Sequence, residues 1–424
     1  MTNKRILICG AGIAGPTLAF WLDRYGFEPV LIESAPALRE GGYIIDFWGR
    51  GFDIAEMMGL QPALMENGYH IKELRIVDDK GRRSGGFTLQ SIEKVLQGRY
   101  ISILRSDLSR LIYGALGGRV RTVFGNTITG IEQDAGGVQV IFAHGKPERF
   151  DLVIGAGGLH SPVRNLVFGP KCGYECYLGY YAASFSIGGY PHRDPDAYIS
   201  YSLPGRQVAR YSLRDGRTVF LFVFAPDAKV PFDHHDQAAQ KALLHERFGS
   251  GKWECPGILG ALNKADSLYF DAVSQIHMPE WSNGRVALVG DACFCPSLLA
   301  GQGSALAMTA TYILAGELKK AQGDHAAAFS NYEQLFRPFI ERKQQAAARF
   351  ATSFAPKTRF GIAVRNAVTR LMALPLVARL TMVESRMGAV AWGLWPSPRF
   401  PSPLIELDVP ISGIQLSGWL HHEA

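Results

Sequence analysis

The chain has 424 residues, of which 47% are hydrophobic, 19% are charged and 47 are glycine. This composition suits a large α/β protein with many tight turns and excludes a disordered or fibrous chain. The formal net charge of +6 is dispersed without a basic run, which is weak evidence for an anionic ligand and no evidence for nucleic-acid binding.

The N-terminus is predicted to form a strand, a helix and a second strand over residues 5–9, 13–25 and 28–33. The two strand segments are short apolar runs, and the segment between them carries hydrophobic residues at helical spacing. Together they predict a β-α-β unit, the repeating element of a parallel sheet.

The middle of the chain changes from mixed to antiparallel character. Residues 101–115 predict a strand entering a helix, and residues 137–142 and 150–154 predict a hairpin that returns to the sheet. Residues 177–224 alternate Tyr, Ser, Val and Phe between recurrent turns, which predicts an antiparallel sheet inserted between α/β segments.

The last third is mainly helical. Its predicted elements are a helix over 236–248, a buried strand over 285–290, and helices over 304–320, 325–353 and 361–393. Pro375 is expected to break or kink the last helix, and a proline-rich tail over 396–412 is expected to be extended.

Three glycines follow the first predicted strand in the pattern GxGxxG. Gly10 permits the tight turn, Gly12 lets a pyrophosphate approach the backbone, and Gly15 lets the helix pack on the strand. Glu33 ends the second strand, where its carboxylate can accept hydrogen bonds from a ribose 2′-hydroxyl. The arrangement predicts a dinucleotide site for FAD or NAD at the N-terminus of the helix.

A second glycine-rich loop follows the strand at 285–290. Asp291 stands at the end of that strand, where it can bind a polyol hydroxyl or serve only as a turn residue. The turn Gly301–Gln302–Gly303 opens the next helix, whose N-terminus can stabilise negative charge. This loop is therefore a second candidate for ligand contact.

The six cysteines give no CxxC pair and no metal-ligand spacing, so no metal site is predicted. The N-terminus enters a strand at once and lacks a signal peptide. The longest uncharged run, 292–316, is interrupted by Pro296 and by a glycine turn, which argues against a membrane span. We therefore expect a cytoplasmic protein with reduced thiols.

Four segments, GAGIAGPTLAFWL…VLIE, ILRSDL, DLVIGAGGLHSPVR and RVALVGDACFCPSLLAGQGSALAM, resemble the motifs of one enzyme family in order and spacing. This is the p-hydroxybenzoate hydroxylase family of single-component, group A, FAD-dependent aromatic monooxygenases. The resemblance covers roughly residues 4–345. Residues 28–51 and the segment after Gly290 look most like the branch that contains tetracycline-inactivating monooxygenases.

The resemblance implies an α/β fold: a Rossmann-like FAD-binding domain of the GR2 type, an inserted antiparallel β-sheet substrate domain and C-terminal helices. The FAD-binding domain would be discontinuous, over 1–75, 101–170 and 275–345. The substrate-binding sheet would take 76–100 and 171–274, and residues 346–424 would form a C-terminal helical region with an extended tail.

The resemblance also assigns roles to residues of this chain. The turn of Gly10, Gly12, Ile13, Ala14 and Gly15 would hold the FAD pyrophosphate. Further FAD contacts are implied for Glu33 and Ser34 at the adenosine ribose, Arg39, Arg105 at the flavin side chain, Gly157, Asp291 at the ribityl chain, and Gly301, Gly303 and Ser304 at the flavin ring. Pro296, Gly301 and Gln302 would form the environment of the flavin peroxide, in the catalytic position.

The chemistry implied is oxygenation of a hydrophobic aromatic or polyketide-like small molecule through a flavin C4a-hydroperoxide formed with O2. NADPH or NADH would supply the electrons, and the protein would supply orientation, a dry cavity and charge stabilisation. Such an enzyme fits secondary metabolism or antibiotic modification, as a monomer or homodimer.

Two motifs depart from the family pattern, at three positions. The second motif normally reads GADG, but here Gly157 takes the place of the acid. Phe294 and Leu298 stand where the family usually has histidine and proline. These departures leave two alternatives open: a non-redox cyclase in which FAD is structural, and an FAD-bound protein that sequesters its ligand.

Overall fold

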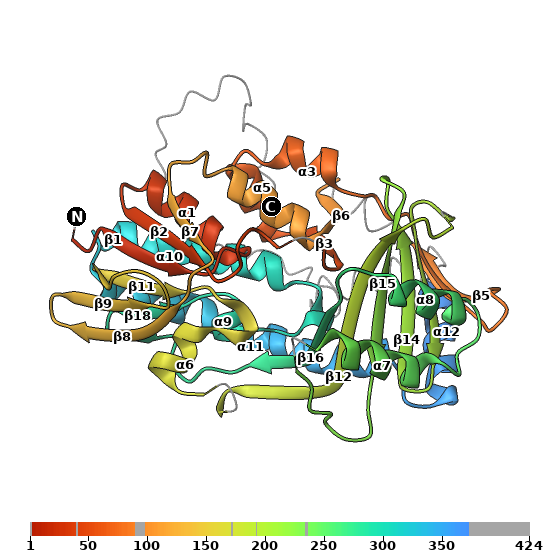
Figure 1. Ribbon diagram of the computed structural model, residues 1–424. Helices are drawn as coiled ribbons and strands as arrows, with labels where there is room; N and C mark the ends of the chain where they lie inside the picture. Colours follow the sequence, from red (N-terminus) through yellow and green to blue (C-terminus); the bar gives the residue numbers. More distant parts are fainter. Residues whose placement is uncertain are drawn as a thin grey trace, which may run out of the picture.

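The computed structural model describes residues 2–39, 41–89, 98–170, 173–191, 193–233 and 236–372 (Figure 1). Within them the chain folds into two bodies that lie side by side, one built on a mostly parallel sheet and one on a large antiparallel sheet. The expected α/β class is confirmed. The expected helix beyond residue 372, with its kink at Pro375, and the extended tail over 396–412 lie outside the described residues.

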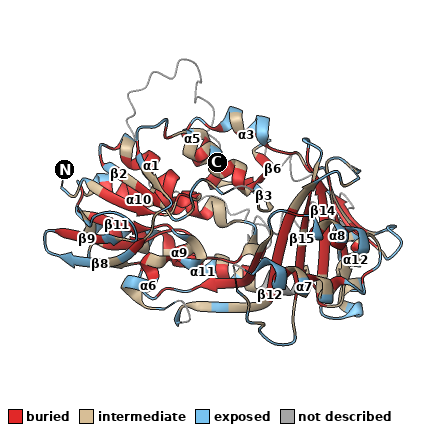
Figure 2. Cartoon of the chain, viewed as in Figure 1, coloured by how far each residue is buried: buried red, intermediate tan, exposed pale blue. Residues whose placement is uncertain are grey.

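The first body is built on a six-stranded sheet with the order β17-β18-β11-β1-β2-β7. Its strands are β1 (Arg5–Cys9), β2 (Glu28–Glu33), β7 (Arg121–Phe124), β11 (Leu152–Gly155), β17 (Ser282–Asn283) and β18 (Val286–Leu288). All neighbours pair in parallel except β17 and β18. The central strands β1, β11 and β18 are almost wholly buried because helices cover the sheet (Figure 2), as parallel sheets require, whereas the edge strands β7 and β17 are partly exposed.

Three long helices complete this body: α1 (Ala14–Arg24), α10 (Gly303–Lys320) and α11 (His325–Phe354). Helix α10 packs against α1 and α11, and also against the short helix α2 (Arg50–Met57). Helix α3 (Gln61–Asn67) follows α2. The shared core includes Leu18, Trp21, Leu314 and Tyr332, each almost fully buried.

The expected strand over 150–154 is divided into two. Residues 148–150 form β10, which joins β8 (Ile128–Asp134) and β9 (Gly137–Phe142) in a separate three-stranded sheet. The chain then enters the parallel sheet as β11. The change occurs at Asp151, whose carboxylate accepts a hydrogen bond from the Arg5 backbone N–H at 2.8 Å and whose own N–H donates to the Arg5 carbonyl. The predicted single strand was therefore wrong, because Asp151 moves the chain from one sheet to the other.

The second body is a seven-stranded sheet with the order β16-β12-β15-β14-β13-β4-β5. Its strands are β4 (Glu73–Val77), β5 (Arg83–Thr88), β12 (Glu175–Gly188), β13 (Ala197–Leu203), β14 (Arg206–Ser212), β15 (Arg217–Phe224) and β16 (Tyr269–Ile276). Strand β4 runs across the boundary expected between residues 75 and 76, so this body begins at Glu73.

Helices α7 (Gln237–Phe248) and α8 (Cys255–Asn263) cover one face of this sheet, and α12 (Arg359–Met372) lies on the opposite face, against β5 (Figure 1). Because side chains alternate between the two faces, most of the sheet's aromatic side chains lie under α7 and α8. There they form a core that includes Tyr181, Phe185, Tyr201, Phe220, Phe222 and Phe224. These rings therefore stabilise the fold, as expected for most of them, and do not face the first body.

The opposite face of the sheet meets the first body. There β3 (Ile44–Trp48) and β6 (Tyr100–Leu104) form an antiparallel pair, and α5 (Arg105–Gly114) follows β6 directly. Leu104 of β6 packs with Tyr211 and Val219 of the sheet. Near β16, Leu299 packs with Tyr180, Val223 and Val273. This seam between the two bodies is where the loops of the first body converge.

Candidate functional site

Two glycines of the GxGxxG turn are required by the fold itself. Gly10 has φ +119°, and a Cβ on it would lie 2.5 Å from the Ala156 carbonyl oxygen. A Cβ on Gly15 would lie 1.9 Å from the Gly10 carbonyl oxygen. Any side chain at either position would displace backbone: at Gly10 because the turns that follow β1 and β11 touch one another, and at Gly15 because α1 starts directly against the Gly10 carbonyl.

Gly12 is different, because nothing in the described protein fills the space beside it. A Cβ on Gly12 would meet only the Arg105 Nη2 atom, at 4.0 Å. The residue before α1, Ile13, makes no side-chain capping bond, so the first N–H groups of the helix remain available. An open space between a helix N-terminus and a guanidinium has the shape and charge that a phosphate requires.

Glu33 lies at the end of β2 and holds the neighbouring turn. Its carboxylate accepts hydrogen bonds from the N–H groups of Ala11 at 2.8 Å and Ala35 at 3.0 Å, and from the Ser34 hydroxyl at 3.1 Å. Ser34 is exposed beside it. Arg39 lies exposed in the loop after β2, and its role stays a prediction.

The second glycine-rich loop reaches the same place from the far part of the chain. Gly290, with φ +63°, faces the Ala14 side chain of α1, and a Cβ on Gly303 would lie 3.5 Å from Asp291 Oδ1. Asp291 begins the short helix α9 (Asp291–Phe294), and the positive charge of Arg105 acts on its carboxyl. The structure therefore brings together the predicted residues Ala14, Arg105, Asp291 and Gly303.

The charges of this cluster are held away from bulk water. Burial raises the pKa of the Asp291 carboxyl, and Arg105 only partly offsets this shift. Burial works against the Arg105 charge, yet Tyr43 and Asp291 raise its pKa above the usual value. Both side chains nevertheless keep some accessible surface. Groups that are poorly hydrated but still accessible border an internal space, which is the environment expected of a cofactor cavity.

The turn after β11 carries Gly157, where a Cβ would lie 3.1 Å from Pro162 Cδ. The motif ends in Arg164, at the start of α6 (Pro162–Phe168), and this side chain is fully buried. Arg164 donates hydrogen bonds to the carbonyl oxygens of Leu159 at 2.6 Å and Ala292 at 2.9 Å. It therefore ties the turn η1 (Gly158–His160) to α9, a structural role that the sequence did not reveal.

The loop after α9 carries the predicted catalytic residues. Ser297 has φ +110°, a strained conformation for a residue with a side chain, and its hydroxyl accepts a hydrogen bond from the Leu299 N–H. Pro296 is buried beside it, and Leu298 begins the turn η3 (Leu298–Ala300). Gly301 then takes a left-handed conformation, and the next helix begins after Gln302.

Phe294, in place of the expected histidine, belongs to the core. Its ring centroid lies 5.0 Å from that of Trp281 and 5.5 Å from that of Phe336 on α11. The side chain at this position therefore faces away from the seam. The departure at Phe294 is explained by packing, and it removes no polar group from the seam.

Four residues at the seam are not among the residues predicted from the sequence. Tyr43 precedes β3 and Tyr269 begins β16, and their ring centroids lie 5.3 Å apart across the two bodies. Burial raises the pKa of Tyr43 to about 12 and that of Tyr269 further, so both hydroxyls stay protonated at neutral pH. His160 Nε2 and Asp271 Oδ2 lie 2.9 Å apart and join η1 to β16.

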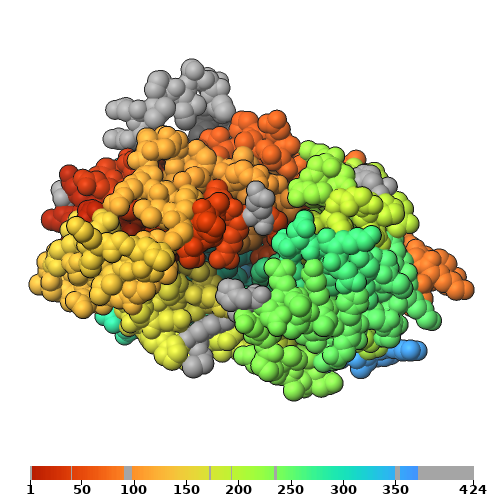
Figure 3. All heavy atoms as spheres, in the orientation of Figure 1, coloured from red at the N-terminus to blue at the C-terminus, as the bar shows by residue number. Residues whose placement is uncertain are grey.

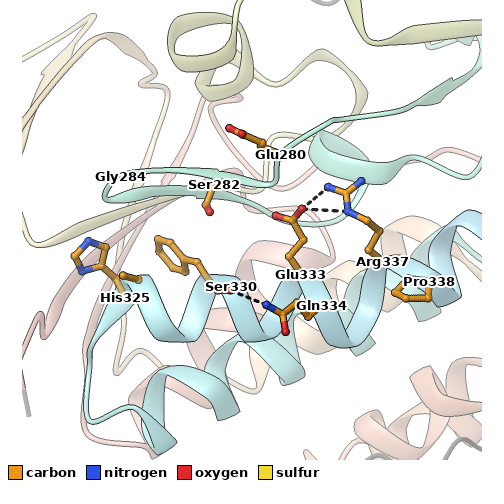
Figure 4. A pocket seen from close by; sticks show the side chains of 11 residues that line it. Glu280, Ser282, Gly284, His325, Ser330, Glu333, Gln334, Arg337 and Pro338 are labelled. Carbon is orange, nitrogen blue, oxygen red and sulfur yellow. Dashed lines mark hydrogen bonds and ion pairs between the residues drawn. The ribbon is translucent and has the colours of Figure 1, made fainter.

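Figure 3 shows the surface hollowed between the N-terminal residues, in red and orange, and the sheet residues, in green. A separate open groove lies on another part of the first body, between the β17 turn and the first half of α11 (Figure 4). His325, Phe329 and the ion pair of Glu333 with Arg337 line that groove. None of the predicted site residues lines it, so we place the candidate site at the seam.

Within the described ranges, no group of His, Cys, Asp and Glu side chains is arranged to hold a metal ion. The described helices include none that is both long enough and apolar enough to cross a membrane.

Known proteins are similar to this chain over most of its length. Residues 3–346 match the family described as "FAD binding domain". A flavin-dependent monooxygenase from an unknown prokaryotic organism is 37% identical over 360 residues, which cover 83% of this chain and 90% of that protein.

Two solved structures extend the comparison. The crystal structure of tetracycline destructase Tet(55) is similar with a TM-score of 0.77 and 32% identity, covering 92% of this chain and 98% of that one. A variant of Klebsiella pneumoniae HpxO complexed with FAD has a TM-score of 0.74 at 23% identity, covering 91% of this chain and 98% of that one, and this likeness supports the fold alone.

Proposed function

The chain belongs to the FAD-binding-domain family of flavin-dependent monooxygenases, and on that premise we propose its substrate class, its reductant and the residues that hold its cofactor. It is an FAD-dependent monooxygenase, and FAD is its cofactor. The two alternatives, a non-redox cyclase and a ligand-sequestering protein, are not favoured, because the named relatives are monooxygenases.

We propose that the FAD pyrophosphate lies in the open space beside Gly12. The N-terminus of α1 and the Arg105 guanidinium would together neutralise it. Glu33 would accept hydrogen bonds from the adenosine ribose, and Asp291 would accept them from the ribityl chain. The observation that carries this assignment is the convergence of Gly12, Arg105 and Asp291 at one seam, although they lie in three distant segments.

FAD supplies the redox chemistry, since it takes two electrons from a nicotinamide and uses them to activate O2. The surrounding residues orient the reactants and exclude water. The Asp291 carboxyl would accept hydrogen bonds from hydroxyls of the bound cofactor, and the N-terminus of α10 at Gly303 would stabilise negative charge that develops beside it. Pro296, Gly301 and Gln302 would shape the wall at which O2 is activated.

We propose a hydrophobic aromatic or polyketide-like substrate that binds between this wall and the face of the large sheet. On that face Tyr180 and Val223 are buried against Leu299 of the η3 turn, and the Ser184 hydroxyl donates to the Gly42 carbonyl at 3.3 Å, so the wall and the sheet are already in contact beside the proposed binding space. A similar solved structure is a tetracycline destructase, so a polycyclic polyketide antibiotic is a reasonable probe. NADPH or NADH is the proposed electron donor.

The test is turnover with tetracycline as the probe. Purified protein with FAD confirmed by its absorbance is mixed with NADPH or NADH, with and without tetracycline, and reductant oxidation, O2 consumption and product mass are followed. The proposal predicts an oxygenated product, heavier by the mass of one oxygen atom, in proportion to reductant oxidised. Product formed while the flavin stays oxidised would refute the redox assignment. Oxidation of the reductant without product would show only that tetracycline is not a substrate.

We also propose that the protein works in the cytoplasm as a monomer or a homodimer. The two bodies would then be the FAD-binding domain and the substrate-binding domain, with the start of the latter moved from residue 76 to Glu73. Light scattering on the purified holoenzyme distinguishes the two oligomeric states, and a larger assembly would contradict the proposal.

A further inference from the structure

We propose that Gln275 and Gln344 are positioning residues that hold the loop 294–297 in place beside bound FAD. They thereby determine what fraction of the oxidised NAD(P)H yields oxygenated product. This inference rests on the proposed location of FAD at the seam. In this proposal neither side chain contacts FAD itself. Both act through the backbone carbonyls of the loop.

Gln344 lies on α11 and is buried, with 3% of its surface exposed. Its Nε2 group donates to the carbonyl oxygens of Ile276 at 2.8 Å, and of Phe294 and Cys295 at 3.3 Å each. Two N–H bonds serve three acceptors, so the two longer contacts share one hydrogen. One amide therefore joins α11, β16 and the loop.

Gln275 lies on β16 and is equally buried. Its Nε2 group donates to the carbonyl oxygens of Pro296 at 2.9 Å and Gln344 at 2.7 Å. Since both its N–H bonds are used, its Oε1 must accept, and the His277 Nε2 group donates to it at 2.9 Å. The two glutamines thus bind three consecutive carbonyls, at residues 294 to 296, one from β16 and the other from α11.

The loop needs this support because its conformation is costly. Ser297 follows directly with φ +110°, a region that residues with a side chain adopt only when their surroundings impose it. The three preceding residues are buried, where an unsatisfied carbonyl is expensive, and the Cys295 carbonyl also accepts from the Ile276 backbone N–H at 3.1 Å. On one side the loop continues from Asp291, and on the other it leads to Leu299, which packs on the sheet. Movement of the loop therefore shifts both walls of the seam.

The functional consequence concerns the coupling between NAD(P)H oxidation and oxygenation of the substrate. In the productive reaction, NAD(P)H, a proton, O2 and substrate give NAD(P)+, oxygenated product and water. When oxygen transfer fails, NAD(P)H, a proton and O2 give NAD(P)+ and hydrogen peroxide. Both consume the same two electrons, so the ratio of peroxide to reductant reports whether substrate and flavin are correctly placed.

The test compares Gln344→Met and Gln275→Met with a matched control, Gln240→Met. Methionine keeps the length and volume of glutamine but cannot donate. Gln240 lies on α7, is 3% exposed and donates to the Asp233 carbonyl at 2.7 Å, so it is an equivalent buried amide remote from the loop. For each holoenzyme, hydrogen–deuterium exchange of the amides in 292–301, the visible spectrum of bound FAD and the FAD dissociation constant are measured without turnover.

We expect the two loop variants to exchange the 292–301 amides about tenfold faster, the effect of losing roughly one hydrogen bond. We also expect a shifted absorption spectrum of bound FAD. With any probe that the enzyme oxygenates, we expect more hydrogen peroxide per NAD(P)H oxidised. The control should change exchange only around α7. Unchanged exchange and spectrum in both loop variants would overturn the proposal, as would equal changes in the control. If Gln344→Met does not fold, Gln275→Met decides the question. The exchange result stands even if tetracycline is not a substrate, so failure here is separable from failure of the proposed function.

Discussion

Replacement of Gly12 by valine separates a glycine that serves the ligand from glycines that serve the fold. In the structure a Cβ on Gly12 meets nothing closer than the Arg105 guanidinium at 4.0 Å, and Gly12 does not have a positive φ. The protein without FAD should therefore accept the valine. At Gly15, by contrast, a Cβ would lie 1.9 Å from a backbone oxygen, so even alanine should disturb the fold.

The magnitude follows from the contacts that the valine would exclude. A hydrogen bond from a backbone N–H to a charged phosphate contributes about 1.5 to 3 kcal/mol. If the side chain keeps the pyrophosphate from two such groups at the start of α1, FAD binding weakens by about 3 to 6 kcal/mol. The FAD dissociation constant then rises by roughly 10² to 10⁴. The free energy of unfolding of the FAD-free protein should change by less than about 0.5 kcal/mol, as at an unconstrained surface position.

The assay is a titration of FAD-free protein, followed by quenching of flavin fluorescence, beside urea unfolding of the same preparations. Gly15→Ala is the control, and it should lower the stability of the FAD-free protein. If Gly12→Val retained stoichiometric FAD with wild-type affinity, the pyrophosphate would not lie beside Gly12. If it unfolded as readily as Gly15→Ala, the interpretation of open space at Gly12 would be mistaken.

Three further variants test the neighbouring turns and charges. Gly157→Asp should speed flavin reduction by NADPH and should lower the unfolding free energy by about 1 kcal/mol because of the contact with Pro162. Stopped-flow absorbance measures the reduction rate, and an unchanged rate would mean that this position has no role in reduction. Arg164→Met removes the donor from the buried Ala292 carbonyl and from the partly buried Leu159 carbonyl, and should lower the unfolding free energy by about 2 kcal/mol in urea titrations. Wild-type stability would mean that other donors replace it. The folded-state pKa of Asp291 is raised above its unfolded value, so its favourable contribution is lost as pH rises through that raised pKa. Asp291→Asn should therefore stabilise the FAD-free protein more at pH 7 than at pH 4, and an advantage that did not grow with pH would contradict the raised pKa.

The sequence by itself determined the parts that depend on neighbouring residues. Strands β1, β2 and β9 begin and end where the apolar runs do, and α7 and α10 lie within one residue of their predicted bounds. The GxGxxG turn and the glycine-rich loop at Asp291 could be found because their backbone requirements are written in consecutive positions. The order of those motifs was sufficient to identify the family.

Only the tertiary structure decided which distant residues meet. Asp151 ends one strand pairing and starts another because it bonds Arg5, 146 positions away. Arg164 looked like the last residue of a ligand motif, yet it ties η1 to α9 through two backbone carbonyls. Gln275 and Gln344 carry no local signal at all, since a buried amide looks in sequence like any exposed one. Hydrogen bonds to backbone carbonyls leave no trace in the identity of the accepting residues, so the supports of the seam become visible only when the chain is folded.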